Sequence, residues 1–248
     1  MKLFWQQIPS TVITEILCSS SLDGVILDLE HGHFNNETLY SCIQVGTLLN
    51  KKVFARFSHL DRQVMRMCLD ANISGVILST VEDFDQAQEF YDYCIYPFKN
   101  KVENFSQDQM GVVRKSHITQ TGGKRGQGLV RENLWGKKKL NLRKPIIIPQ
   151  IETEKGVNNI KSISSIAFDH FLIGPYDLSA SLGEVGNFEG SRFKECIDKL
   201  KDAVGDKIGF HIPTNVKNEI EKYKNYNFLA LGMDTTFIQE KILEVENL

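Results

Sequence analysis

The sequence lacks the features that would assign the protein to a membrane, secreted or nucleic-acid-binding class. It contains no run of about 18 consecutive apolar residues, the length that a transmembrane helix requires. Its N-terminus has no basic stretch followed by an apolar one, the pattern of a secretion signal. Charge of one sign is not in excess, since 29 Lys and Arg stand against 31 Asp and Glu, for a net charge of −2. We therefore expect no nucleic-acid or membrane partner and a cytoplasmic location.

Cysteine pairing is also lacking. The five cysteines are scattered, odd in number and never spaced as CxxC. This arrangement argues against a disulfide framework and against a thiolate zinc site. Most of them lie in apolar stretches with helical spacing, so we expect them to be buried small hydrophobic side chains.

The chain does have a regular alternation of short apolar runs, rich in β-branched residues, with longer segments of helical periodicity. This pattern is typical of repeated βα units and a parallel sheet. We expect strands near residues 2–7, 24–29, 52–57, 75–79, 145–151, 170–174, 207–212 and 228–233. The helices expected between them cover 11–19, 36–49, 61–72, 81–94, 155–166, 191–204, 216–226 and 237–246. An α/β fold follows, a single-domain (β/α)8 TIM barrel over residues 1–248, with an open doubly wound sheet as the alternative.

One segment, residues 96–144, breaks this alternation. It has no clean strand, it is rich in Lys, Asn, Gln and Gly, and it includes TGGKRGQG. A loop of this length inside a compact domain is usually a functional lid or a mobile segment. Its polar composition predicts little burial of apolar area.

Ionisable side chains gather at the ends of the predicted strands. In barrel enzymes the reactive groups follow the carboxyl ends of the strands. Glu152 and Asp177 follow neighbouring strands, so their carboxylates could converge on one divalent cation. Oxygen ligands without a nearby cysteine pair favour Mg²⁺ or Mn²⁺. The other polar residues at strand ends are Asp28, Glu30, His31, Arg56, Gln150, His211 and Asp234.

Arg56 and His31 are the candidates for handling charge and protons. The forked guanidinium of Arg56 suits an oxyanion, although a structural ion pair is the alternative. Histidine titrates near neutral pH, so His31 could relay a proton with Asp28 orienting its ring, although a lone histidine is more often structural. The glycines and small residues around Asp177 are expected where backbone approaches a small ligand closely.

Four strings resemble the HpcH/HpaI aldolase/citrate lyase family: DLEHG, RMCLDANISGVIL, QIET and GPYDLSASLG. That family includes 4-hydroxy-2-oxoheptanedioate aldolases, and the resemblance runs over residues 23–234 except for about 96–123. It implies a (β/α)8 barrel, assembled as a homo-oligomer and usually as a hexamer built from dimers. It also implies a divalent metal cation, Mg²⁺ or Mn²⁺ with Co²⁺ as a further candidate, that holds pyruvate as its enolate.

The resemblance also implies a role for individual residues. Arg56 would polarise the ketone oxygen, and His31, paired with Asp28, would act as acid and base through metal-bound water. Asp70 would reach into the site of a neighbouring subunit. The remaining positions would be Glu152 and Asp177 as metal ligands, Gln150 lining the pyruvate pocket, and the backbone at Gly174, Pro175 and Tyr176 holding the pyruvate carboxylate.

The sequence departs from the family pattern in three places, one of which is that Phe57 is not followed by the proline that the family often has. A long insertion separates Tyr96 and Pro97 from Arg125 and Gly126, which the family has close together. Tyr176 stands where a small residue is usual. These departures concern the aldehyde side of the site, while the residues expected to bind metal and enolate are present.

The expected function is a metal-dependent class II aldolase that cleaves or forms 4-hydroxy-2-oxo acids from pyruvate and an aldehyde. No lysine is placed at a strand end as a Schiff base, which disfavours a class I route. One alternative is a CoA-thioester lyase of the same superfamily, which would need a basic surface such as the lysines of the insertion. The other is a non-catalytic barrel acting as a binding or assembly protein. The joint presence of Glu152, Asp177, Arg56 and His31 argues against it.

Overall fold

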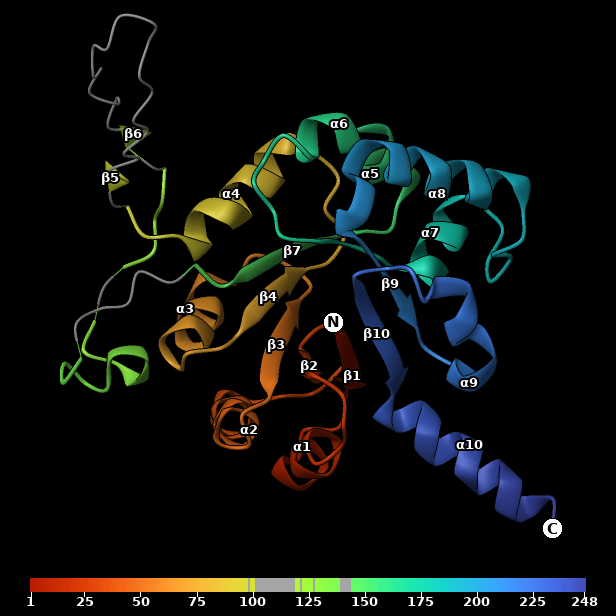
Figure 1. Cartoon of the computed structure of the whole chain (residues 1–248), viewed down its shortest axis with the longest axis horizontal. Helices are drawn as coiled ribbons and strands as arrows, with labels where there is room; N and C mark the ends of the chain where they lie inside the picture. Colours follow the sequence, from red (N-terminus) through yellow and green to blue (C-terminus); the bar gives the residue numbers. More distant parts are fainter. Residues whose placement is uncertain (98, 101–118, 121, 127, 139–143) are drawn as a thin grey trace, which may run out of the picture.

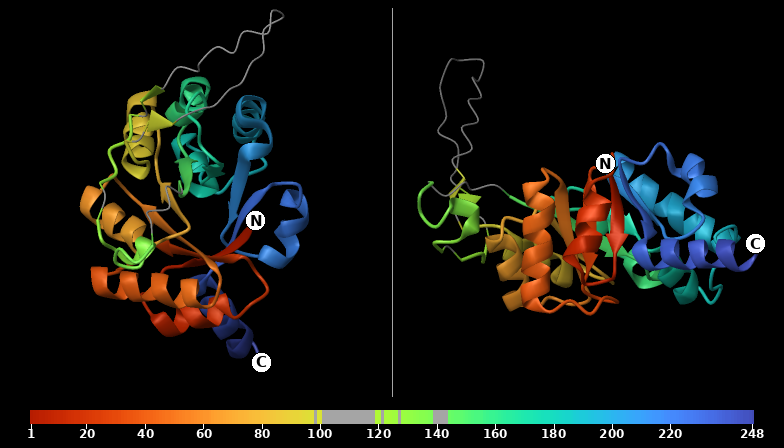
Figure 2. Two further views of the ribbon diagram at one scale, coloured as in Figure 1. Left: turned by 60° about the vertical axis from the view of Figure 1, so that its left-hand side comes forward. Right: turned by 90° about the horizontal axis from the view of Figure 1, so that it is seen from below.

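The computed structural model describes residues 1–97, 99–100, 119–120, 122–126, 128–138 and 144–248. Eight parallel strands close into a barrel in the order β1-β10-β9-β8-β7-β4-β3-β2, which confirms the predicted (β/α)8 class (Figures 1 and 2). The strands are β1 (Lys2–Gln6), β2 (Gly24–Asp28), β3 (Lys52–Phe57), β4 (Gly75–Leu78), β7 (Ile146–Ile151), β8 (Phe171–Ile173), β9 (Ile208–Ile212) and β10 (Phe228–Met233).

Alternation along each strand divides the core into two compartments. Side chains that point inward fill the barrel; Phe54 and Phe228, for example, meet edge to face with ring centroids 5.8 Å apart. Side chains that point outward join the helices in a second, larger apolar cluster. Because parallel strands in a barrel are buried on both faces, they read as continuous apolar runs. The inner cluster consists of Leu3, Trp5, Ile26, Phe54, Ile77, Ile148, Leu172, Phe228 and Ala230.

Helices surround the barrel, and several begin at side chains that cap free backbone N–H groups. Asn35, Asp61, Asp83 and Thr153 each accept such a bond at a helix start. The helices are α1 (Thr11–Cys18), α2 (Asn36–Leu48), α3 (Arg62–Asp70), α4 (Phe84–Cys94), α5 (Glu154–Asn158), α6 (Ile160–Ile163), α7 (Pro175–Ser181), α8 (Ser191–Val204), α9 (Val216–Glu219) and α10 (Asp234–Glu246).

The structure differs from the expected helices in three places. The helix expected over 155–166 is split at Asn159, whose side-chain amide donates to the carbonyl of Glu82 at 2.8 Å. The helix expected over 216–226 is α9 followed by a 3₁₀ turn, Ile220–Tyr223. The segment after β8, for which no helix was expected, forms α7, with Gly174 as N-cap and Pro175 in the first turn. Proline is preorganised for that position, so the glycine-rich string did not exclude a helix.

The long excursion is more ordered in its second half than its composition predicts. Arg125 is buried beneath α3, where it donates to the carbonyl of Leu69 at 3.2 Å and pairs with Glu132 at 2.5 Å. The Tyr96 hydroxyl donates to the same carboxylate at 2.8 Å. The expectation that this segment buries little apolar area holds for its described part, where Leu129 and Trp135 are exposed, although one buried ion pair anchors it. Two short strands, β5 (Lys99–Asn100) and β6 (Thr119–Gln120), pair antiparallel, and residues 101–118 lie outside the described residues.

The five cysteines are buried and free, as expected. Within the described residues, no helix is both long and apolar enough to cross a membrane.

Candidate active site

The polar residues singled out in the sequence form the uppermost layer inside the barrel. On β2, β3 and β9 the inward positions after the apolar core are Asp28, Arg56 and His211, which continue the alternation of the strands. Strand register sets Asp28 of β2 directly beside Arg56 of β3. The carboxyl ends of the strands therefore carry a polar floor above an apolar core.

A buried ion pair between Asp28 and Arg56 lies at the centre of this floor. The guanidinium donates from Nε to Asp28 Oδ1 at 2.9 Å and from Nη2 to Oδ2 at 2.8 Å. Trp5 Nε1 and Gln7 Nε2 donate to the same carboxylate at 3.0 and 3.2 Å. Burial by itself raises the pKa of Asp28, but the bonds and charge of Arg56, aided by Trp5 and Gln7, outweigh it and lower the pKa to about 2. Asp28 is therefore ionised throughout the physiological range.

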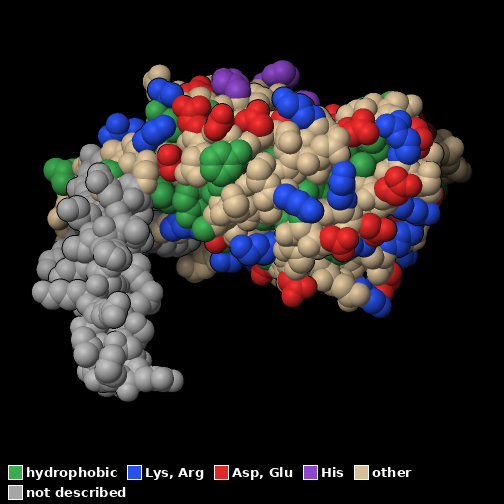
Figure 3. Space-filling model, turned by 90° about the horizontal axis from the view of Figure 1, so that it is seen from above, with side chains coloured by type: hydrophobic (Ala, Val, Ile, Leu, Met, Phe, Trp, Pro, Cys, Tyr) green, Lys and Arg blue, Asp and Glu red, His purple; other side chains and the backbone are tan. Residues whose placement is uncertain are grey.

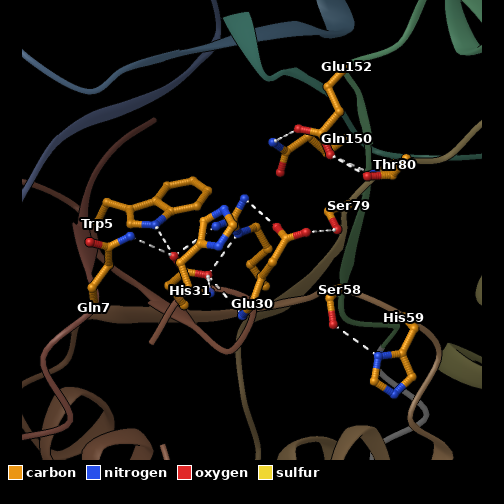
Figure 4. Close-up of polar contacts among 12 residues, drawn as sticks. Trp5, Gln7, Glu30, His31, Ser58, His59, Ser79, Thr80, Gln150 and Glu152 are labelled. Carbon is orange, nitrogen blue, oxygen red and sulfur yellow. Dashed lines mark hydrogen bonds and ion pairs between the residues drawn. The ribbon is translucent and has the colours of Figure 1, made fainter. Parts of the chain in front are cut away.

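A second carboxylate fixes the other side of Arg56. Glu30 Oε2 lies 2.6 Å from Arg56 Nη1, and Ser79 Oγ donates to Glu30 Oε1 at 2.9 Å. The guanidinium carbon also lies 4.6 Å from the centroid of the Trp5 ring. Figure 4 shows Trp5, Gln7 and Glu30 on one side of the site and Gln150 with Glu152 across from them. Arg56 is thus held in one orientation, with donors beyond these three contacts available to an anionic ligand.

Glu152, at the end of β7, is almost fully buried and lacks a cationic partner of its own. The backbone N–H and hydroxyl of Thr80 donate to Oε1 at 2.7 and 2.8 Å, and Gln150 Nε2 donates to Oε2 at 2.5 Å. Burial raises its pKa to about 7, and the negative charge of Asp177 acts in the same direction against the bonds from Thr80. The ionised form of Glu152 therefore needs positive charge nearby.

The donor set suits a hard divalent cation. No three His, Cys, Asp or Glu side chains form a metal-binding group among the described residues, so Glu152 and Asp177 would be the only carboxylate ligands. Magnesium commonly takes one or two carboxylates and completes its shell with substrate and water. A Cβ at position 174 would lie 2.3 Å from Glu152 Oε2, so only glycine there lets this carboxylate pack against the backbone. Arg56 contacts two carboxylates, Asp28 and Glu30, and the negative charges of Asp177 and Glu30 act on Glu152, so negative charge is in excess here, which favours a cation as ligand.

The structure brings most of the predicted site residues together, with two differences. His31 is exposed at the rim, and its backbone N–H, not its ring, bonds to Asp28 Oδ1 at 3.3 Å. Arg56 saturates that carboxylate, so the expected pairing of the His31 ring with Asp28 is not made. Asp70 ends α3 just before β4 starts, at the opposite end of the barrel, beside Arg66. Figure 3 shows histidine side chains at the upper edge of this face, with acidic side chains below them and elsewhere on the face.

The residues expected to hold the pyruvate carboxylate lie at the start of α7. Gly174 and Pro175 are buried, whereas Tyr176 is exposed and packs edge to face on Phe188 at 5.1 Å. Asp177 is exposed and lies in the first turn of this helix. Its negative charge raises the pKa of Glu152, which indicates that the two carboxylates are near each other. The backbone N–H groups of a helix start attract anions.

Sequence reasoning assigned no role to several residues that shape the site. Trp5 and Gln7 bond to Asp28, Ser79 bonds to Glu30, and Thr80 bonds to Glu152. Ser79 and Thr80 end the run GVILST, so their position at a strand end was the available signal. The search for ionisable side chains passed over them because neither of them carries a charge.

The chain is similar to known proteins over nearly its whole length. The family model described as HpcH/HpaI aldolase/citrate lyase matches residues 2–239, so the chain belongs to that family. The chain is 24% identical over 249 residues to a 4-hydroxy-2-oxovalerate aldolase from Rhodococcus jostii, covering 96% of this chain and 87% of the relative. It is 23% identical to a hydroxypyruvate/pyruvate aldolase from Delftia acidovorans, covering 96% and 84%.

The fold is also that of a solved structure from this family. A crystal structure of a family protein from Burkholderia cenocepacia superimposes with a TM-score of 0.82 at 17% identity, covering 100% of this chain and 93% of the other. The chain is thus a barrel of the HpcH/HpaI aldolase/citrate lyase family, and the two relatives named above are aldolases.

The raised pKa of Glu152 predicts how stability depends on pH. A carboxyl whose pKa is 4.5 when unfolded and about 7 when folded holds a proton in the folded state across that window. Its contribution to stability is therefore present below pH 4.5 and is lost as the pH rises to 7, by up to roughly 3 kcal/mol. Denaturant unfolding in EDTA should show this loss, Glu152→Gln should remove it, and Mn²⁺ should restore stability at pH 7. Glu195→Gln, on the exposed face of α8, is the control; a wild-type slope in Glu152→Gln would contradict the assignment.

Proposed function

We propose that the protein is a metal-dependent class II aldolase, which cleaves or forms 4-hydroxy-2-oxo acids through a pyruvate enolate. The observation that carries this proposal is the pairing of a rigid guanidinium with an unneutralised buried carboxylate at the same barrel end. Arg56 is held by Asp28 and Glu30, while no cationic side chain among the described residues bonds to Glu152, on which the negative charge of Asp177 also acts. Such a site is suited to an oxyanion and a divalent ion bound together.

Glu152 and Asp177 would hold Mg²⁺, Mn²⁺ or Co²⁺, which when bound supplies positive charge for the oxygens of a 2-oxo acid. Arg56 would direct its remaining donors at the ketone oxygen, where negative charge develops as the bond between the third and fourth carbons breaks. The backbone at Gly174, Pro175 and Tyr176 would hold the carboxylate, and Gln150 would line the pocket. His31, exposed at the rim, would accept the proton of the 4-hydroxyl as the aldehyde leaves.

The nucleophile would be pyruvate or its 3-hydroxy derivative, the two donors in the name of the Delftia relative. The alternative, a CoA-thioester lyase, would need a basic surface, and no contact among the described residues favours it. The lysines expected to supply that surface fall largely in or beside residues that are not described. A non-catalytic barrel would have no need to bury a guanidinium held by two carboxylates beside the carboxylate of Glu152.

Exchange of the pyruvate methyl protons with deuterated solvent in the presence of Mn²⁺ tests this proposal directly. The wild type should exchange them, and EDTA should stop the exchange. Arg56→Lys should lower the rate at least about 10²-fold, because a point charge cannot keep the two-carboxylate contacts and still face the ketone oxygen. Arg62→Lys, an exposed arginine of α3 paired with Glu89, is the matched control and should leave the rate unchanged. Absence of metal-dependent exchange in the folded wild type would overturn the proposal.

We further propose that the protein acts as a homo-oligomer, with α10 packing on a second copy. Figure 1 shows α10 extending away from the barrel, and its residues from 238 onward are exposed. It presents Ile238 and Ile242 on one face, and α1, on the same side of the barrel, presents Val12 and Ile16 at the same spacing. Exposed apolar stripes of this kind mark interaction sites, and two copies would cover each other's stripes. Assembly would also allow Asp70, remote from its own rim, to approach a neighbouring site.

Light scattering coupled to size exclusion measures this assembly. The double variant Ile238→Asp/Ile242→Asp should move the protein to a smaller species, because charge cannot be buried without a partner. Glu244→Lys changes the charge by the same amount on the polar face of α10 and should leave the assembly intact. Circular dichroism confirms that both variants fold. A wild type that is monomeric at micromolar concentration would refute the proposal.

A further inference from the structure

Thr80, just after β4, has a backbone conformation that threonine rarely adopts. Its φ is 50°, in the left-handed region, where a β-branched side chain is crowded by its own backbone. The residues on both sides of it are bonded to neighbouring strands. Ser79 donates its backbone N–H to the carbonyl of Phe57 on β3 at 2.9 Å, and Val81 donates to that of Gln150 on β7 at 3.0 Å. Strained residues that are held in this way by their surroundings are concentrated at functional sites.

The left-handed turn directs both donors of Thr80 at one carboxylate oxygen. Side chains alternate along β4, with Ile77 in the barrel core and Ser79 bonded to Glu30 in the site, so a continued strand would point Thr80 outward. Instead, its backbone N–H and its hydroxyl donate to Glu152 Oε1 at 2.7 and 2.8 Å (Figure 4). The strain at Thr80 is therefore coupled to the position of the Glu152 carboxylate.

The hydrogen bonds to Glu152 leave one of its lone pairs for a further partner. An ionised carboxylate has about four lone-pair sites, shared equally by its two oxygens. Within the described part of the chain, Thr80 occupies both sites on Oε1, and Gln150 Nε2 occupies one on Oε2 at 2.5 Å. A cation that approached Oε1 would also meet the positive ends of the two Thr80 dipoles. Oε2 is therefore the oxygen of Glu152 that can coordinate a cation.

We infer that Thr80 is a positioning residue that limits Glu152 to one coordinating oxygen and thereby selects a small octahedral cation, Mg²⁺ or Mn²⁺, against Ca²⁺. This inference rests on the proposed function, which makes Glu152 a metal ligand. Mg²⁺ requires near-octahedral geometry and is commonly bound through one or two carboxylates together with water. Ca²⁺ takes about six to eight oxygen ligands and accepts both oxygens of one carboxylate. With Asp177 as the second carboxylate, the restricted site offers few protein oxygens to Ca²⁺.

The test measures the affinity for the two cations alone, without substrate. Mn²⁺ binding is followed by the loss of the EPR signal of the free ion, and Ca²⁺ binding by its competition with Mn²⁺. Thr80→Gly keeps the backbone N–H and suits a left-handed conformation, but it frees one lone pair of Glu152 Oε1. The ratio of Ca²⁺ to Mn²⁺ affinity should rise about tenfold in this variant, because Glu152 can then offer both oxygens. Thr80→Ser keeps the hydroxyl and should keep the wild-type ratio.

Asn50→Gly is the matched control. Asn50 is an exposed left-handed residue with a φ of 57°, and it lies between α2 and the start of β3, at the opposite end of the barrel. Its substitution should leave the ratio unchanged. An unchanged ratio in Thr80→Gly, or an equal rise in Thr80→Ser, would overturn the inference while leaving the proposed function standing. A wild type that binds neither cation would overturn both. The expected ratios without exchange of pyruvate protons would overturn the proposed function alone.

A crystal structure of the wild type with Mn²⁺ tests the same point without a variant. Oε2 should be the only oxygen of Glu152 that coordinates the ion, and Oε1 should keep both bonds from Thr80. In a crystal of Thr80→Gly with Ca²⁺, both oxygens should lie about 2.3–2.6 Å from the cation. Coordination of Mn²⁺ by both oxygens of Glu152 in the wild type, or by Oε1 alone, would refute the inference.

Discussion

The Asp28–Arg56 pair is the interaction on which the rest of the site depends. Both side chains are buried, and the charge of each is offset chiefly by the other. Removal of Arg56 would leave Asp28 as a buried charge without its cationic partner. The pair also organises its neighbours, since Trp5 and Gln7 bond to the carboxylate and Glu30 bonds to the guanidinium. Because the buried guanidinium of Arg56 must be paired, its carboxylate partners also fix its orientation.

The other half of the site has the opposite electrostatic character. Arg56 neutralises only one of its two carboxylate partners, and Glu152 has polar donors but no cation. Uneven neutralisation of this kind costs stability in the free protein and is relieved when a cation binds. Functional sites commonly combine such destabilised groups with a rigid scaffold. Here the closed barrel is that scaffold, because every strand has two neighbours and cannot shift alone.

Local sequence could predict the strands well and the shorter helices less well. Runs such as GVILDL and PIIIPQI are apolar throughout because both faces of their strands are buried. The helix over 155–166 was not predicted correctly, because the break at Asn159 depends on a bond to Glu82, more than seventy residues earlier. The short helix that begins at Pro175 was not predicted, because seven residues show too little helical periodicity. Arg125 could not be placed, since its partner Glu132 and its cover α3 meet only in the folded chain.

The sequence by itself determined the barrel, the family and the set of polar side chains at the strand ends. It did so because strand alternation and strand ends are local properties, readable from apolar periodicity. Only the tertiary structure decided which of those side chains meet. The register of β2 against β3 sets Asp28 beside Arg56 and so leaves the ring of His31 without that carboxylate. Closure of β9 and β10 around β1 brings His211 onto Trp5, residues far apart in the chain, and no local pattern encodes that contact.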